Sequence, residues 1–156
     1  MFARIARVGL VAVFLAGQPA AHAACLRLTG HPDGPQFAAF AVAPDDPTFV
    51  ITYVHSVTRT PVIERYAIAG SEIVETEMRF EQHGPGLPTE ADAGGTFRRS
   101  DGGFVVTMYR HWPEIVMQLH RDQSPRLATG AFSLDLAQWG NRALVLGIVP
   151  GPCTGP

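Results

Sequence analysis

A histidine and a glutamate stand on either side of a predicted hairpin loop in this sequence. The segment Thr58–Pro61 has the composition of a four-residue turn between two strand-like runs. Such a loop places His55 opposite Glu64 and Tyr53 opposite Tyr66 on one face of a sheet. An imidazole beside a carboxylate is a pairing found in hydrolases, in metal sites and in ordinary structural hydrogen bonds.

The next turn extends this arrangement to a third strand. Gly70-Ser71 predicts a two-residue hairpin, which sets Glu77 beside Glu64 and leaves Arg79 two residues further along on the same face. His55, Glu64 and Glu77 then form a row across three neighbouring strands. Two adjacent carboxylates repel each other unless a proton, a cation or an arginine lies between them. We therefore expect a binding site here, with His55, Glu64, Glu77 and Arg79 among its residues.

Two other interpretations of this row remain open. A His–Glu pair at the end of a hairpin often does no more than steady the loop by a hydrogen bond. Alternatively, a small hydrolase or a metal-dependent enzyme would use His55 with Glu64. Zinc sites normally need further nitrogen or sulfur ligands, and Ser56 would point to the opposite face of the strand from His55. The sequence also lacks a G-x-S-x-G motif, so it assigns no catalytic residue, no metal ligand and no cofactor.

Two further segments supply binding candidates. Gly84 and Gly86 alternate with prolines in Gly84-Pro85-Gly86-Leu87-Pro88, a composition that fits either a tight structural corner or a loop lying close to a ligand. Arg110 lies among aromatic residues in Tyr109-Arg110-His111-Trp112 and could grip a carboxylate, with Trp112 facing a partner or the core. We add Gly84, Gly86 and Arg110 to the candidate binding residues.

Composition limits the classes of protein to which this chain can belong. It has 156 residues, of which 46% are hydrophobic and 17% charged, so we expect one folded domain and no second one. Its 14 acidic residues outnumber its 12 basic ones, and the net charge is −2. A negative net charge disfavours nucleic acid as a partner.

The N-terminus has the pattern of a cleavable secretory signal. Two arginines precede the apolar run Val8–Gly17, and Ala21-His22-Ala23 supplies the small residues of a cleavage site. We predict a signal peptide over residues 1–24, cleaved near Ala23–Ala24, and a single β-rich domain over residues 25–156 in the periplasm or outside the cell. The apolar run is too short to span a bilayer, so no transmembrane span is expected in the mature chain.

The two cysteines allow two mutually exclusive modifications, lipidation of Cys25 or a disulfide bond between Cys25 and Cys153. Cys25 follows the predicted cleavage site, where a lipoprotein would carry its lipid, but His22 stands where such a signal wants a leucine-like residue. An oxidising compartment instead favours a disulfide between Cys25 and Cys153. We expect the disulfide and keep lipidation as the alternative.

Short runs of β-branched and aromatic residues alternate with glycine, proline and aspartate, and no window keeps a helical period. This pattern predicts an all-β fold, a small antiparallel sandwich or barrel. The region Gly84–Arg99 is expected to be a long loop, and Asp101-Gly102-Gly103 a tight turn. The expected strands are 26–29, 36–42, 48–56, 62–68, 72–80, 104–109, 115–120, 132–136 and 143–149.

An ordered series of these motifs resembles a family of bacterial exported proteins, the domain of unknown function 1850. The shared features, over about residues 26–149, are His55-Ser56-Val57, Thr60-Pro61-Val62 with Glu64, Glu77 with Arg79-Phe80, and Gly84-x-Gly86-Leu87-Pro88. Members tend to be encoded beside tripartite (TRAP-type) solute transporters whose binding component is of the TAXI class. The resemblance therefore implies an accessory role in solute uptake.

These observations predict a periplasmic binding or interaction module, whose partner is a transporter component or a small-molecule ligand. The hydrolase or metal-dependent enzyme using His55 and Glu64 is one alternative. A purely structural envelope domain is the other.

Overall fold

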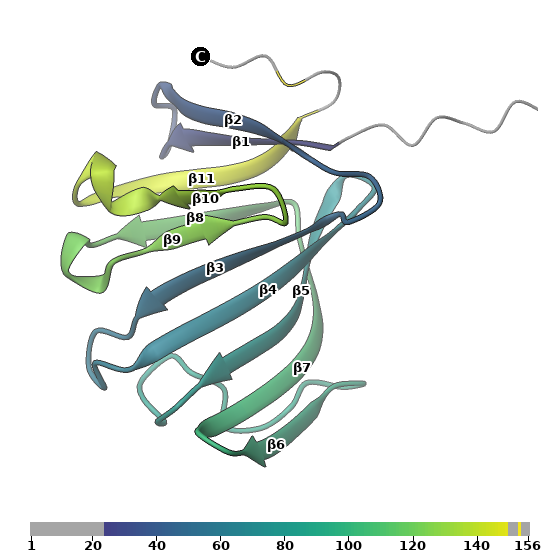
Figure 1. The fold of residues 1–156 in the computed structure, drawn as a ribbon, viewed down its shortest axis with the longest axis vertical. Coiled ribbons are helices and arrows are strands. Elements are labelled where there is room, and N and C mark those ends of the chain that lie inside the picture. The colour runs from purple at the N-terminus through teal and green to yellow at the C-terminus, as the bar shows by residue number, and fades with distance from the viewer. Residues whose placement is uncertain (1–23, 150–152, 154–156) are drawn as a thin grey trace, which may run out of the picture.

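The computed structural model describes residues 24–149 and residue 153. Over these residues the chain forms two antiparallel sheets that pack as an open sandwich (Figure 1). One sheet has four strands in the order β2-β1-β11-β8, and the other has seven in the order β10-β9-β3-β4-β5-β7-β6. The elements are β1 Ala24–Gly30, β2 Gln36–Val42, β3 Thr48–Val54, β4 Pro61–Ala69, β5 Glu72–Phe80, β6 Thr96–Ser100, β7 Gly103–Trp112, β8 Glu114–Leu119, the 3-10 helix η1 Arg121–Gln123, β9 Arg126–Ala128, β10 Ser133–Asp135, the 3-10 helix η2 Leu136–Trp139 and β11 Arg142–Val149.

The main hydrophobic core lies between the two sheets. Leu26 and Leu28 of β1 and Leu146 of β11 are fully buried and belong to the same cluster as Phe49 of β3. The ring of Phe49 stacks on that of Tyr66, with centroids 5.0 Å apart. Each of these side chains contributes about 1.5–3 kcal/mol by leaving water. The all-β prediction is confirmed, and the two open sheets make the fold a sandwich.

The seven-stranded sheet extends beyond the four-stranded one, as the lower half of Figure 1 shows for β4, β5, β7 and β6. A second hydrophobic cluster covers this part of its inner face. Its buried members are Val62, Met78, Phe80, Leu87, Val106 and Met108. Leu87 comes from the connection between β5 and β6, so that connection closes the second core.

A single proline carries the chain from one sheet to the other. β7 ends at Trp112 in the seven-stranded sheet, and β8 begins at Glu114 in the four-stranded sheet. Pro113 has no N–H to donate to a ladder, so it suits a point where strand pairing changes. Beyond the corner at Pro113, Ile115 and Met117 of β8 pack against the core cluster that contains Tyr66 of β4 and Ile73 of β5.

Nine of the observed strands correspond to the nine predicted ones, and two were missed. Four of the five residues of β6 lie in the region Gly84–Arg99, which was wrongly expected to be loop throughout, and β9 has only three residues. The two tight turns are confirmed: Ala69 pairs with Glu72 around Gly70-Ser71, and Ser100 pairs with Gly103 around Asp101-Gly102.

The predicted register between β3 and β4 is wrong. Val54 pairs with Pro61, so the loop spans six residues, His55–Thr60, and Ile51 rather than His55 lies opposite Glu64. The reason lies in the His55 side chain. Its Nδ1 accepts hydrogen bonds from the backbone N–H groups of Val57 and Thr58, at 3.3 and 3.1 Å, which turns the chain away from the strand at once.

The predicted alignment of Glu64 with Glu77 is also wrong. Tyr66 pairs with Glu75 as expected, but a bulge then follows, and Arg65 rather than Glu64 lies opposite Glu77. One extra residue reverses the side to which every following residue points. Glu77 and Arg79 therefore lie on the outer face of the sheet, away from Glu64.

The disulfide between Cys25 and Cys153 is confirmed, with Cα atoms 5.2 Å apart, and it ties β1 to the C-terminal segment. A bridged Cys25 thiol cannot carry a lipid. The predicted signal sequence lies in residues 1–23, outside the described residues. Within residues 24–149, no helix is long and apolar enough to cross a membrane.

Candidate functional site

A hollow lies between the two sheets beside the corner at Pro113, bordered by Trp112 and Glu114 on either side of the proline, and we call it the inter-sheet cleft. Its volume is about 420 Å³, and its walls come from β4, β5, β7 and β8. A second hollow of about 220 Å³ continues from it toward β3 and shares Glu64, Ile115 and Val116. The cleft is lined by Glu64, Tyr66, Glu75, Met78, Arg110, Trp112, Glu114, Ile115 and Val116.

Two tyrosines hold the carboxylate of Glu64. The hydroxyl of Tyr53 donates to Oε1 at 2.9 Å, and the hydroxyl of Tyr66 donates to Oε2 at 2.7 Å. Tyr66 lies two residues along β4 on the same side as Glu64, and Tyr53 pairs with Val62, so the strand register places both rings beside the carboxylate. Burial, followed by the charge of Glu64, raises the pKa of both tyrosines far above their ordinary value of 10.0, which keeps them protonated donors.

Glu75 is the most deeply buried charged residue of the cleft, with 4% of its surface exposed. Burial raises the pKa of its carboxyl above the ordinary 4.5, and the charge of Glu64 raises it further. Arg110 and a hydrogen bond with Trp112 act in the opposite direction without reversing the shift. The nearest guanidinium nitrogen, Nη1 of Arg110, is 3.7 Å from Oε2 of Glu75.

Arg110 makes its closest contacts with a different carboxylate. Its Nε and Nη2 lie 2.6 and 3.2 Å from the two carboxylate oxygens of Asp92, which belongs to the connection before β6. This pairing lowers the pKa of Asp92 and raises that of Arg110. The guanidinium is therefore shared between Asp92 at the surface and Glu75 inside the cleft.

His55, Gly84 and Gly86 form a separate structural contact. Because Nδ1 of His55 accepts from two backbone N–H groups, Nε2 carries the hydrogen and donates to the carbonyl oxygen of Pro85 at 3.1 Å. His55 is 6% exposed and packs directly on Gly84, while Gly86 supplies a positive φ of 86°. The contact joins the β3–β4 loop to the loop that closes the second core. Since His55 does not lie opposite Glu64, the pairing on which the hydrolase or metal-dependent alternative rested is absent.

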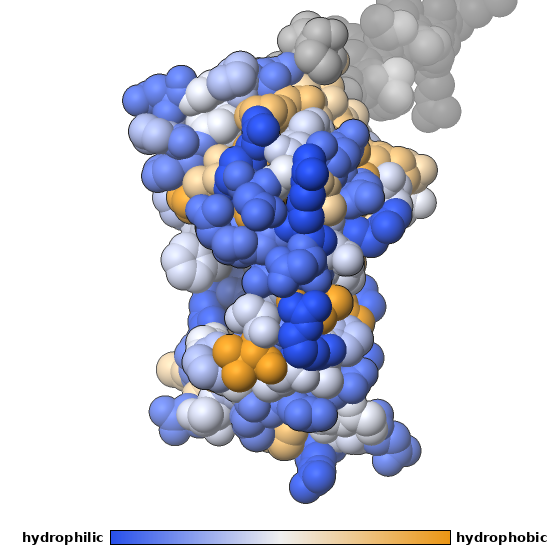
Figure 2. Space-filling model, turned by 90° about the vertical axis from the view of Figure 1, so that its left-hand side faces the viewer, coloured by the Kyte–Doolittle hydropathy of each residue, from blue (hydrophilic) through white to orange (hydrophobic). Residues whose placement is uncertain are grey.

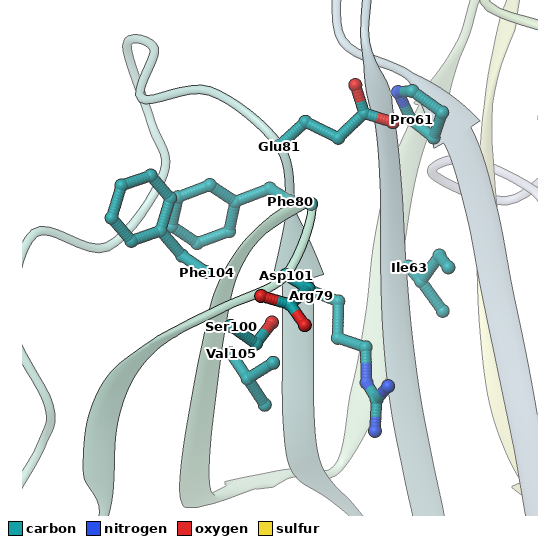
Figure 3. A pocket seen from close by; sticks show the side chains of 10 residues that line it. Pro61, Ile63, Arg79, Phe80, Glu81, Ser100, Asp101, Phe104 and Val105 are labelled. Atoms are coloured by element: carbon teal, nitrogen blue, oxygen red, sulfur yellow. The ribbon is translucent and has the colours of Figure 1, made fainter.

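Glu77 and Arg79 belong to an ion-pair cluster on the outer face. Nε of Arg79 lies 2.6 Å and Nε of Arg65 lies 3.2 Å from Oε1 of Glu77, and these guanidinium groups lower the pKa of Glu77. Arg79 also lines a hollow of about 190 Å³, shown in Figure 3, where Phe80 and Phe104 point to one side of the strands and Ile63 and Arg79 to the other. About half of the Arg79 side chain is exposed, so water screens these contacts and the cluster contributes little stability.

The candidates predicted from sequence thus fall into three places. Glu64 and Arg110 line the inter-sheet cleft, His55, Gly84 and Gly86 join two loops, and Glu77 and Arg79 lie on the outer face. A binding role for any of them stays a prediction. Sequence reasoning missed Glu75 and Asp92 as members of the site. The available signal for Glu75 was its position two residues after Ile73, which places a charged side chain on the face of β5 that the apolar Ile73 occupies.

Among residues 24–149 and 153, no group of three or more histidine, cysteine, aspartate or glutamate side chains is placed to hold a metal ion. Comparison with curated proteins and with solved structures finds no match. A family model, described as a domain of unknown function (DUF1850), matches residues 49–136, which run from the second residue of β3 through β10 and include every residue that lines the cleft. The chain therefore belongs to the DUF1850 family.

Proposed function

We propose that this protein is an exported binding module and that the inter-sheet cleft is its ligand site. The observation that carries the proposal is Glu75, a carboxylate 4% exposed at the wall of an open hollow of about 420 Å³. A buried charge costs stability unless it is closely paired, and Glu75 has no guanidinium nitrogen nearer than 3.7 Å. Titratable groups with shifted pKa values that line a hollow are typical of functional sites.

The surface in view in Figure 2 gives less support for a protein-binding site than the cleft gives for a ligand site. Figure 2 shows a face on which hydrophilic residues dominate and hydrophobic ones form only small separate areas. Broad apolar patches are what mark a permanent protein interface. On the face in view, such an interface has less support than a ligand site in the cleft.

Export is part of the proposal. The signal-like N-terminus and the Cys25–Cys153 bridge both support an oxidising location outside the cytoplasm. The family resemblance implies a partner for this module, because family members tend to be encoded beside TRAP-type solute transporters with a TAXI-class binding component. We propose that the module assists such a transporter, either by holding a solute or by contacting its binding component.

The two tryptophans provide the test. Trp112 lines the cleft, whereas Trp139 packs on Phe37 at the edge of the main core. The exported protein, with its disulfide intact, is titrated with amines, carboxylates, sugars and the transporter's binding component, and the two indole N–H signals are followed by NMR. Movement of the Trp112 signal with the Trp139 signal unchanged is expected for at least one of them. If no compound or partner moves the Trp112 signal, the cleft is not the site and the proposal is wrong.

A further inference from the structure

We infer that the inter-sheet cleft binds a small organic cation, an ammonium or guanidinium group carried on a short apolar stem. This inference rests on the function proposed above and names the chemical class of the ligand. It follows from the charges that line the cleft, from the surfaces between them and from the way in which Arg110 is already engaged.

The lining carries an excess of negative charge. The residues that line it include three glutamates, Glu64, Glu75 and Glu114, and one arginine, Arg110. Glu64 and Glu75 are close enough for the charge of one to raise the pKa of the other. A cation between them would supply the charge that this pair lacks, whereas an anion would meet repulsion from both.

Arg110, the positively charged residue of the lining, is poorly placed to bind an anionic ligand. Its Nε and Nη2 are bound to Asp92 at 2.6 and 3.2 Å, and its Nη1 faces Glu75. A ligand carboxylate would have to displace one of these partners. The guanidinium group of Arg110 is therefore already paired with carboxylates of the protein and is not free to bind an anionic ligand.

The uncharged part of the lining suits the stem of an amine. Tyr66 and Trp112 offer aromatic rings, and Ile115 and Val116 offer aliphatic surface on the opposite sheet. Aromatic faces attract cations, and an alkyl stem gains from contact with aliphatic side chains. A hollow of about 420 Å³ falls within the usual range for small-ligand sites, about 300–1,000 Å³.

Three probes of similar size, n-butylammonium, neutral n-butanol and butyrate, separate charge from shape, and agmatine, a longer dication with an ammonium and a guanidinium group, is the fourth probe. They are titrated into the exported protein while the Trp112 and Trp139 indole signals are followed. The two cations are expected to move the Trp112 signal at concentrations about tenfold or more below those needed for n-butanol, and butyrate is expected to leave it unchanged.

Two substitutions of exposed valines provide the matched comparison. Val116→Arg places a positive charge at the mouth of the cleft, and Val57→Arg places the same charge in the β3–β4 loop. Because Val116 is 52% and Val57 65% exposed, both variants should fold. Val116→Arg is expected to weaken cation binding about tenfold or more, and Val57→Arg to leave it unchanged. Glu75→Gln should also weaken it, whereas Glu77→Gln on the outer face should not.

The outcomes distinguish this inference from the proposed function. If butyrate or n-butanol moves the Trp112 signal at lower concentration than the cations do, the cleft is a binding site but its ligand is not a cation. If another compound of the wider panel binds there and all four probes fail, the inference falls and the proposed function stands. If nothing reaches the cleft, both are wrong. Equal weakening by Val116→Arg and Val57→Arg would also overturn the inference.

Discussion

The imidazole of His55 lies so close to Gly84 that a Cβ atom built on the glycine would stand 2.6 Å from Cε1 of the ring. The same Cβ would lie 2.9 Å from Cγ2 of Thr58. Glycine is thus required at position 84 by the neighbouring side chains. Residues 29 positions apart in the chain depend on each other, because the His55 ring occupies the space that a larger residue would need.

This dependence predicts a double-mutant result. Gly84→Ala should destabilise the protein by about 1–3 kcal/mol through overpacking against the His55 ring. In a His55→Ala background the same change should cost less, since the ring is gone. Urea denaturation of the four proteins measures the difference. Gly86→Ala is the control, because nothing lies within 4 Å of its Cβ position and its cost comes from a φ of +86°. Equal costs of Gly84→Ala in both backgrounds would contradict the prediction.

The tyrosines that hold Glu64 should each contribute to stability. Tyr53→Phe and Tyr66→Phe each remove one hydrogen bond to the carboxylate, and each should lower the free energy of unfolding by about 1–3 kcal/mol, since the bond is to a charged acceptor. Tyr109→Phe is the matched control, because Tyr109 is 65% exposed, and it should change stability by less than about 0.5 kcal/mol. Thermal or urea unfolding at neutral pH measures the free energy of unfolding of the three variants and the wild type. A loss in the Tyr109 variant as large as in the other two would count against the assigned roles.

Glu75 and Glu77 should affect the pH dependence of stability in opposite directions. The pKa of Glu75 is raised in the folded state, so the folded protein binds more protons than the unfolded chain above the ordinary value of 4.5. Stability then falls as pH rises from 4.5 through the folded pKa. Glu75→Gln should therefore stabilise the protein at neutral pH, with the gain shrinking as pH falls toward 4.5.

For Glu77 the sign reverses. Its pKa is lowered by Arg79, so its contribution is present above the ordinary value of 4.5 and is lost as pH falls through the lower folded pKa. Glu77→Gln should destabilise modestly at neutral pH and approach the wild type in acid. Urea denaturation of both variants between about pH 3 and pH 7.5 tests this pair of slopes. Slopes of the same sign for the two variants would be incompatible with the assigned environments.

If the cleft binds a cation, the stabilising effect of Glu75→Gln carries a functional penalty. The variant should be more stable without ligand and should bind n-butylammonium more weakly, because the carboxylate that destabilises the empty cleft is the one that attracts the cation. Comparing its unfolding curve with its NMR titration checks both halves. A variant that gains stability and keeps full cation affinity would separate Glu75 from the site.

The disulfide should contribute substantially to stability. Cys25 and Cys153 are separated by 128 residues, and closing a loop of that length removes much of the entropy of the unfolded chain. The double variant Cys25→Ser, Cys153→Ser should lose about 2–5 kcal/mol of unfolding free energy. The wild type after full reduction should show the same loss, and the variant should not respond to reductant. An unchanged unfolding curve after reduction would refute the prediction.

How much of the site could be predicted depends on the range of the interactions involved. The strands of β2 and β5 and the two-residue turns at Gly70-Ser71 and Asp101-Gly102 follow from local composition, and they agree with the structure. The strand register beyond those turns does not follow from local composition, and the predicted register was wrong. The side-chain turn at His55 and the bulge at Thr76 of β5, opposite Arg65 and Tyr66, each involve only a few residues, yet each moves residues to new partners.

The sequence by itself determined that the chain is β-rich, and it singled out Glu64 and Arg110 as candidate binding residues, because residue type and local alternation carry that information. It favoured a Cys25–Cys153 bridge over lipidation, and the structure decided between the two. Only the tertiary structure decided which side chains meet. Glu64 binds two tyrosines and lies near Glu75 instead of His55, because the loop at His55 and the bulge in β5 set the strand register. β8, beyond the corner at Pro113, supplies the other wall of the cleft. The turn at His55 and the corner at Pro113 are built from local contacts, but the register that finally forms is settled by pairing between strands, and local composition does not encode that pairing.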